Sequence, residues 1–188
     1  ASDVYKRQQL SGSYNSAVLG KNLFEENNKA TKVHVFNSAS ASVGQTQIAL
    51  KIEDLANAGA SFEEIVEQVD AFITEMDTYF VLESLETLRK NGRLSNLKAI
   101  IANVLSIKPI MGATPEGTIC KLDQMRGINK ALGRMAEIIV KNVKNPEKKR
   151  LMISHCNCPE RAELVKESIL SKISVREVLI LDTAGVST

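Results

Sequence analysis

The sequence has no tryptophan, and aromatic side chains make up only 4% of its 188 residues. Proteins that bind single-stranded nucleic acid stack bases on aromatic side chains, so this scarcity disfavours such a role. An excess of one charge is lacking as well, because 24 Lys and Arg residues stand against 22 Asp and Glu residues. A chain without a broad basic field has little general attraction for phosphate backbones. We therefore expect no nucleic acid partner.

Long apolar runs and paired cysteines are also missing. No apolar stretch in the sequence reaches the roughly 18 residues that a membrane-spanning helix needs, which predicts no stable membrane insertion. The cysteines, Cys120, Cys156 and Cys158, are odd in number and unevenly spaced, unlike a disulfide framework. With 44% hydrophobic residues, the chain can still bury a sizeable aliphatic core. Together these features predict a soluble cytoplasmic protein.

The first part of the chain has the pattern of an α/β domain. A β-branched run at residues 31–36 predicts a strand, which leads through a Ser-rich turn into a helix predicted over residues 45–58. Ser61-Phe-Glu-Glu64 is a capping box that opens a further helix. A strand that passes through small residues into a helix is a building unit of parallel sheets. We therefore predict a partial N-terminal α/β domain with a parallel sheet over residues 1–76.

The pattern changes after residue 76. Strand-like segments at residues 107–111 and 118–122 flank Ala-Thr-Pro-Glu-Gly, a turn signal that predicts an antiparallel pair. We predict an α+β C-terminal domain over residues 77–188, with a mixed or antiparallel sheet. Its other expected strands cover residues 78–82, 151–155 and 178–181, and its expected helices cover residues 83–90, 94–105, 127–143 and 159–172.

Two turns present small polar side chains and backbone N–H groups ahead of a helix. They are Ser11-Gly12-Ser13 and Asn37-Ser38-Ala39-Ser40. Helix N-termini attract anions, and ligands of open α/β sheets lie beyond the strand ends. A carboxylate or a phosphate would fit there, although ordinary capping turns have the same composition. From the residues alone, both interpretations stay open.

Arg93 is a further candidate for an acidic ligand. A short amphipathic helix ends at Asn91-Gly92, a pair suited to the left-handed turn that closes a helix, and the arginine follows directly. A guanidinium group can hold a carboxylate through two parallel hydrogen bonds. The alternative is a solvated cation that complements the helix dipole.

Patterns for catalysis or metal binding are weak. The chain has only two histidines, and His34 lies inside the strand predicted at residues 31–36, so no Ser/His/Asp or Cys/His arrangement is indicated. No Walker-type phosphate loop is found in the sequence. His155-Cys156-Asn-Cys158 contains residue types that zinc prefers, but its spacing departs from the usual Cys-x-x-Cys pair. We predict neither catalytic residues nor a metal site.

Several segments together resemble the DegV family of lipid-binding proteins. Leu10-Ser-Gly-Ser-Tyr-Asn-Ser-Ala17 is similar to its Leu-Ser-Gly-Thr-Tyr signature, and Asn37-Ser38 is similar to its Asp-Ser turn. Ser61-Phe-Glu-Glu-Ile65 resembles its mid-chain helix. The stretch from Glu83 through Gly92-Arg93-Leu to Ser95, followed by Ile107-Lys-Pro-Ile-Met-Gly112, resembles another family segment. The resemblance runs from about Leu10 to the end of the chain.

The resemblance implies that the chain encloses a long-chain fatty acid between two domains. It also implies that the bound acid presents its carboxylate to a separate fatty acid kinase subunit, which forms the acyl phosphate. The chain would then be a carrier and not an enzyme, with no cofactor besides its ligand. A small α/β enzyme or a phosphate-ligand-binding protein that uses the same turns is the alternative. The residues implied at the lipid head group are Ser11, Gly12, Ser13, Asn37, Ser38 and Arg93.

The sequence departs from the family pattern at several places. The family has a Ser-Ser pair ahead of its signature where Arg7 and Gln8 stand here, and an acid is typical where Asn37 stands. We expect residues 1–8 to be non-native, and the chain to be a fragment without the family's first and last strands. The family often has a histidine at the position of His155, to which the sequence assigns no role.

Overall fold

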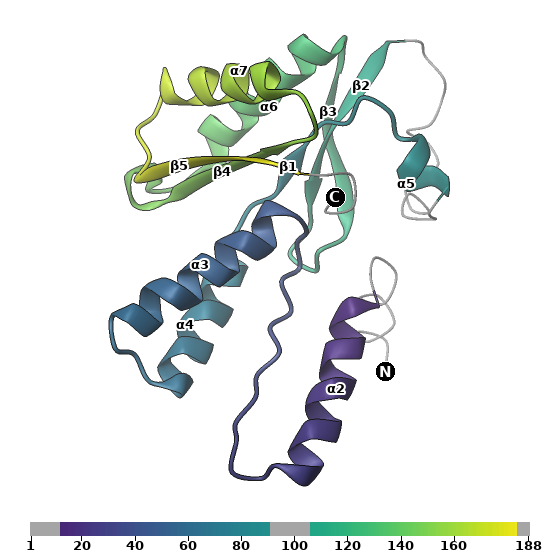
Figure 1. Ribbon diagram of the computed structural model, residues 1–188. Helices are drawn as coiled ribbons and strands as arrows, with labels where there is room; N and C mark the ends of the chain where they lie inside the picture. Colours follow the sequence, from purple (N-terminus) through teal and green to yellow (C-terminus); the bar gives the residue numbers. More distant parts are fainter. Residues whose placement is uncertain (1–11, 91–105, 184–188) are drawn as a thin grey trace.

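The computed structural model describes residues 12–90 and 106–183 (Figure 1). Among these residues, the strands form a three-stranded sheet in the order β1-β2-β3 and a two-stranded sheet of β4 and β5. The strands are β1 (Tyr79–Phe80), β2 (Ile107–Ala113), β3 (Ile119–Arg126), β4 (Arg150–His155) and β5 (Glu177–Asp182). The helices are α2 (Ser13–Asn27), α3 (Val43–Asn57), α4 (Phe62–Thr74), α5 (Glu86–Lys90), α6 (Ile128–Asn142), α7 (Pro159–Leu170) and the 3-10 helix η2 (Pro146–Lys148).

The three-stranded sheet is antiparallel and is covered by α6. β2 pairs with β3 on one side and with β1 on the other, and a β-bulge shifts the register between Ile110 and Met111. Ile110, Ala131 and Ala136 are fully buried and belong to one hydrophobic cluster. The antiparallel pair predicted from the turn signal is therefore confirmed.

The two-stranded sheet is parallel. Its ladder begins with Arg150 opposite Glu177 and ends with His155 opposite Asp182. Two parallel strands that follow each other in the chain need a long connection, and here α7 forms it. The buried Ile169 of α7 packs into the same hydrophobic cluster as α6. The α/β class is confirmed, and the carboxyl ends of both parallel strands meet at one edge.

α3 and α4 form a helical hairpin that packs through Ile48, Leu55 and Val69. The predicted capping box is formed at the start of α4. The Ser61 hydroxyl accepts the Glu64 N–H at 3.3 Å, and the Glu64 carboxylate accepts the Ser61 N–H at 2.7 Å. Reciprocal bonds of this kind satisfy two donors that a helix start would otherwise leave open.

The strand predicted at residues 31–36 is wrong. Residues 32–37 form neither helix nor strand, although Phe36 packs against the α3 and α4 cluster and its ring lies 4.5 Å from that of His34. A β-strand exists only through hydrogen bonds to a neighbouring strand, and none of the described strands pairs with this segment. Parallel pairing therefore lies within residues 150–182 and not among the described residues of the first half.

The predicted domain division at residues 76 and 77 stays a prediction. Several contacts join residues from its two sides. Gln47 of α3 donates a hydrogen bond to the Arg150 carbonyl of β4 at 3.1 Å, and the Arg150 guanidinium lies 3.4 Å from Asp54. The helix predicted at residues 94–105 lies outside the described residues.

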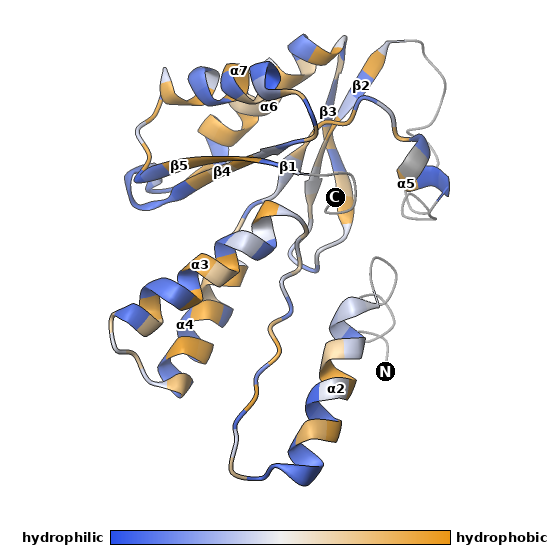
Figure 2. Cartoon of the chain, in the orientation of Figure 1, coloured by the Kyte–Doolittle hydropathy of each residue, from blue (hydrophilic) through white to orange (hydrophobic). Residues whose placement is uncertain are grey.

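The described helices differ in how much apolar surface they bury. α2 has no buried residue, and Leu19, Leu23 and Phe24 are exposed by 60%, 54% and 43%. Figure 1 shows α2 standing apart from the α3 and α4 hairpin, and Figure 2 shows apolar positions along α2.

Over the described part of the chain, no helix is both long and apolar enough to span a membrane.

Candidate functional site

The polar turn at residues 37–42 lies where several elements meet. The Ser40 hydroxyl is 3.0 Å from the Thr78 hydroxyl, just ahead of β1, and the Ser42 hydroxyl donates to Ser154 of β4 at 3.3 Å. A methyl group at Gly117, in the β2–β3 turn, would come within 2.9 Å of the Ala39 carbonyl oxygen. The turn at residues 37–42 therefore contacts β4 and the connections next to the three-stranded sheet, and the lack of a side chain at Gly117 permits the close approach of the β2–β3 turn.

The predicted residues Asn37 and Ser38 hold this turn together. The Asn37 side-chain oxygen accepts the Ala39 N–H at 3.3 Å, and the Ser38 hydroxyl donates to the Ser40 carbonyl at 2.8 Å. Ala39 and Ser42 have φ angles of 46° and 52°, in the left-handed region that most residues avoid. Strain of this kind persists only where the surroundings fix the backbone. A structural role for Asn37 and Ser38 is thus observed, and their ligand role stays a prediction.

The other predicted turn is described only in part. Gly12 directly precedes α2, and its carbonyl accepts the Ser16 N–H at 3.0 Å and the Ser16 hydroxyl at 3.1 Å. Ser13 is the first residue of α2 and is exposed. Ser11 lies outside the described residues. A head-group role for this turn stays a prediction.

Arg93 also lies outside the described residues, so its role stays a prediction, but the segment that leads toward it is fixed. Glu83 accepts a hydrogen bond from Arg161 of α7 at 2.8 Å, and its backbone carbonyl accepts one from Lys108 of β2 at 2.5 Å. The Arg161 hydrogen bond, helped by the Lys108 charge, holds the pKa of the Glu83 carboxyl below its ordinary value. The chain entering α5 is therefore tied to both α7 and β2.

The structure points to a further residue, His155, to which the sequence assigned no role. His155 is the last residue of β4, and its side chain is only 10% exposed. Its Nδ1 accepts the Cys158 N–H at 3.4 Å and lies 3.5 Å from the Asp182 carboxylate. Its carbonyl accepts both the N–H and the hydroxyl of the buried Thr183, at 2.8 and 3.1 Å.

This arrangement leaves one ring nitrogen of His155 for a ligand. Both neighbours of the ring face Nδ1, and within the described residues no hydrogen bond reaches Nε2. The ring stands at the carboxyl edge of a parallel pair, the place where open α/β sheets bind ligands. The preceding residue, Ser154, contacts the turn at residues 37–42 through Ser42. His155 is thus a candidate donor to an acidic group, and only the register of β4 and β5 reveals it.

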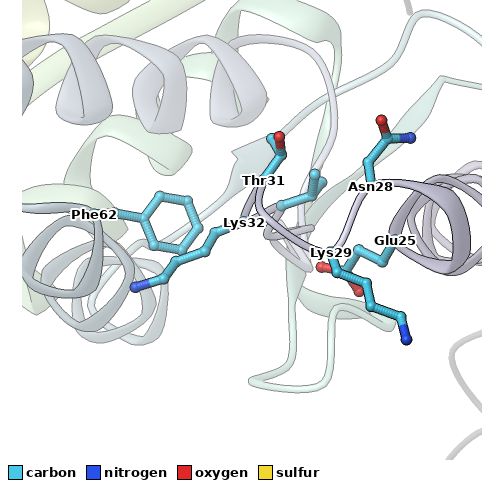
Figure 3. Close-up of a pocket in the computed structure, with 7 residues that line it drawn as sticks. Glu25, Asn28, Lys29, Thr31, Lys32 and Phe62 are labelled. Atoms are coloured by element: carbon cyan, nitrogen blue, oxygen red, sulfur yellow. The ribbon is translucent and has the colours of Figure 1, made fainter.

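An open pocket of about 440 Å³ lies elsewhere, between the end of α2 and the start of α4 (Figure 3). The Lys32 ammonium lies 6.0 Å from the centre of the Phe62 ring and pairs with Glu63. Five of its seven lining residues have polar or charged side chains, and the pocket is open to solvent, whereas an acyl chain needs an enclosed apolar site. None of the predicted site residues lines it; the lining residues are Glu25, Asn28, Lys29, Thr31, Lys32, Val33 and Phe62.

The cysteines beside His155 are free thiols. Cys156 is exposed, while Cys158 and Cys120 are half-buried. Among residues 12–90 and 106–183, no group of three or more His, Cys, Asp or Glu side chains is placed to hold a metal ion. The described residues therefore offer no ligand set for zinc.

Comparison with known proteins identifies the family. Residues 7–188 match the DegV family, described as an uncharacterised protein family. The chain belongs to the DegV family, as its motifs indicated. It is 34% identical to the DegV domain-containing protein spr0652 of Streptococcus pneumoniae, over 94% of this chain and 62% of that protein. It is 29% identical to protein CPE0026 of Clostridium perfringens, over 91% of this chain and 59% of that protein. The chain thus spans only part of the length of these relatives.

Solved structures of similar proteins contain fatty acids. A DegV family protein from Ruminococcus gnavus, solved with vaccenic acid, is 54% identical, with a TM-score of 0.91 over 96% of this chain and 64% of that chain. The Streptococcus pneumoniae fatty acid kinase (Fak) B3 protein, loaded with linoleic acid, is 32% identical, with a TM-score of 0.83 over 95% of this chain and 63% of that chain. A protein from Eubacterium eligens, loaded with heptadecanoic acid, is 28% identical, with a TM-score of 0.85 over 95% and 64%.

Proposed function

We propose that this chain is part of a carrier that encloses a long-chain fatty acid between two domains. The observation that carries the proposal is the match, at 54% identity and a TM-score of 0.91, to a DegV family protein that holds vaccenic acid. Close backbone agreement at this identity supports a shared mode of ligand binding. The carrier has no cofactor of its own, and the fatty acid is its ligand.

Burial of the acyl chain supplies the affinity. About 15 methylene groups at roughly 0.8 kcal/mol each give an upper bound near 12 kcal/mol, which the costs of ordering and association reduce. Polar contacts at the carboxylate add orientation more than affinity. Such contacts fix which end of the ligand faces the protein surface.

The proposed head-group contacts come from four places in the chain. Hydroxyl and backbone N–H groups of the two polar turns would donate hydrogen bonds to the carboxylate, and Arg93 would pair with it. His155 joins this set because its Nε2 is available at the carboxyl edge of the parallel sheet. The complete proposed set is Ser11, Gly12, Ser13, Asn37, Ser38, Arg93 and His155.

We further propose that the carrier presents the carboxylate to a separate kinase subunit, in the cytoplasm. The similarity to a fatty acid kinase B3 protein at 32% identity supports this partner. Phosphoryl transfer would then take place on the kinase, so that this chain binds and orients without catalysing. The three free thiols of Cys120, Cys156 and Cys158 suit a reducing compartment.

Extraction of lipids from the purified protein, followed by mass spectrometry, tests the proposal. We expect a long-chain fatty acid in near-stoichiometric amount. A lipid-free protein that instead binds phosphate esters tightly would favour the small α/β enzyme or phosphate-binding alternative. A lipid-free protein that binds neither ligand would contradict both functions.

A further inference from the structure

Residues 33–36 form a strand-like segment that has no neighbouring strand among the described residues. Val33, Val35 and Phe36 give it the composition of a β-strand, and all four of its residues are half-buried. Within the described part of the chain, no hydrogen bond reaches the backbone N–H or carbonyl groups of this segment. Backbone groups that are withdrawn from water are almost always hydrogen-bonded in native proteins. The segment is therefore an open strand edge.

The two sides of this edge face different parts of the fold. The rings of His34 and Phe36 lie 4.5 Å apart, and Nε2 of His34 lies 3.9 Å from the Asp70 carboxylate of α4. Side chains alternate along an extended chain, so Val33 and Val35 point to the opposite side. Val33 borders a pocket that residues at the end of α2 also line. Figure 1 shows the segment running between the α3 and α4 hairpin and α2.

α2 exposes the half of its surface that carries no charge. At about 100° per residue, the arc from Leu19 round to Ala17 contains only apolar or uncharged residues, and all of them are exposed. The half-buried residues of α2 lie on the opposite side, which includes the Lys21–Glu25 ion pair. A helix at the surface of a complete domain has the reverse arrangement, with its apolar side covered. The exposed, uncharged face consists of Ser13, Ser16, Ala17, Leu19, Gly20, Leu23, Phe24 and Asn27.

We propose that the open edge and the uncharged face of α2 bind the same partner, namely β-strands formed by sequence that the longer relatives contain outside the matched region. The chain covers 62% of protein spr0652 and 64% of the Ruminococcus gnavus chain, so more than a third of each has no counterpart here. The inference concerns how the first domain is completed and goes beyond the proposed function. Because the turn at residues 37–42 directly follows the edge, the added strands would also support the candidate site.

The chemistry of the two surfaces favours strands over other occupants. A fatty acid could cover the apolar helix face, but it has no N–H group and cannot pair with a strand edge. Neighbouring strands lie about 4.8 Å apart and a helix is about 10 Å wide, so at least two strands are needed to cover α2. A second copy of this chain would add one strand together with a further uncovered α2. A sheet with α2 on one face and the α3 and α4 hairpin on the other is a common α/β arrangement.

Hydrogen–deuterium exchange, measured by mass spectrometry on this chain and on the Ruminococcus gnavus protein, tests the pairing. Both proteins are first freed of lipid, so that no ligand protects the amides. In this chain, residues 33–36 should exchange within about tenfold of the rate of an unstructured peptide, because their amides have no acceptor. The aligned segment of the Ruminococcus gnavus protein should exchange at least roughly a hundredfold more slowly. β2 is the reference in both proteins, because it is bonded to β1 and β3 and should exchange slowly.

Three results would overturn the pairing. The first is fast exchange of the aligned segment in the Ruminococcus gnavus protein. The second is slow exchange of residues 33–36 in a monomeric chain, which would place the partner within this chain. The third is slow exchange together with the mass of a dimer in analytical ultracentrifugation, which would assign the edge to a second copy. None of these results bears on fatty acid binding, which lipid extraction tests separately.

Two matched variants test the helix face. Leu23 is 54% exposed on α2, whereas Leu55 is 9% exposed and packs between α3 and α4. Leu23→Gln should leave the thermal unfolding midpoint of this chain unchanged to within about 1 °C, and Leu55→Gln should lower it by at least about 5 °C. A similar fall in both variants would show that this face of α2 is already covered, and would overturn its assignment to added strands.

Discussion

Arg150 and Glu177 form an ion pair at the first position of the parallel ladder, with Nε of the arginine 2.6 Å from the carboxylate. The Arg150 side chain is only 11% exposed, and its guanidinium also lies 3.4 Å from Asp54 of α3. One cation thus joins β4, β5 and the α3 and α4 hairpin. Because the turn at residues 37–42 leads into α3, this contact also helps to position the candidate site.

Arg150→Ala should lower the free energy of unfolding by about 1–2 kcal/mol, because it removes a mostly buried guanidinium together with its hydrogen bonds to Glu177 and Asp54. Urea unfolding followed by circular dichroism measures this loss. Arg176→Ala is the matched control, since Arg176 is 52% exposed and lies 3.8 Å from the same Asp54 carboxylate. Its expected loss is below about 0.5 kcal/mol. Equal losses of unfolding free energy in the two variants would show that the burial of Arg150 does not strengthen its ion pairs.

Gly117→Ala should destabilise the chain by about 1–2 kcal/mol, because the position has a φ of 77° and its new methyl group would meet the Ala39 carbonyl. Thermal unfolding measures the change. Gly133→Ala in α6 is the control, since no atom lies within 4 Å of its added methyl group and alanine favours helices. It should leave stability unchanged or raise it. A harmless Gly117→Ala would mean that the contact between the hairpin and the turn at residues 37–42 is not tight.

Stability should fall in acid partly through Glu64. Hydrogen bonds from the Ser61 backbone N–H, and then from its hydroxyl, hold the pKa of the Glu64 carboxyl below its ordinary value of 4.5. A lowered pKa means that the charged carboxylate stabilises the fold above the ordinary value, and that this contribution is lost as the pH falls through the lower, folded-state value. Urea unfolding between about pH 5 and pH 3 should therefore show a weaker pH dependence in Glu64→Gln. Identical pH profiles would exclude this contribution.

His155→Gln should reduce the fatty acid content of the purified protein, because glutamine cannot place a ring N–H at the position of Nε2 while accepting the Cys158 N–H. His34→Gln is the control: His34 is the other histidine, and it lies 3.9 Å from Asp70, away from β4 and β5. Lipid extraction and mass spectrometry of both variants give the comparison. Equal lipid content in the two variants would remove His155 from the proposed head-group set.

Local chemistry predicted the elements that short-range contacts determine. The capping box at Ser61 and the β2–β3 hairpin were both predicted, because a few adjacent residues fix each of them. Residues 31–36 have the composition of a strand, but the composition of a segment does not determine whether another strand lies beside it to form hydrogen bonds. The apolar residues of α2 recur at helical spacing, but Leu19 and Leu23 stay exposed. Long-range pairing and packing decide such segments.

The candidate site was predictable to a similar extent. Sequence motifs indicated the turn at Asn37-Ser38, and the structure places that turn against β4 and the residue ahead of β1. They could not show that His155 and Asp182 meet, because the two residues are 27 positions apart in the sequence and only the register of β4 and β5 brings them together. A histidine that ends one parallel strand and an acid that ends the next would have been the available signal.

Native mass spectrometry of the purified protein, before and after addition of vaccenic acid, tests the central claim most directly. The account predicts a species heavier than the bare chain by the mass of one long-chain fatty acid, present on purification or restored by the added acid. A protein that stays at the mass of the bare chain in both samples, while remaining folded, would contradict the carrier function.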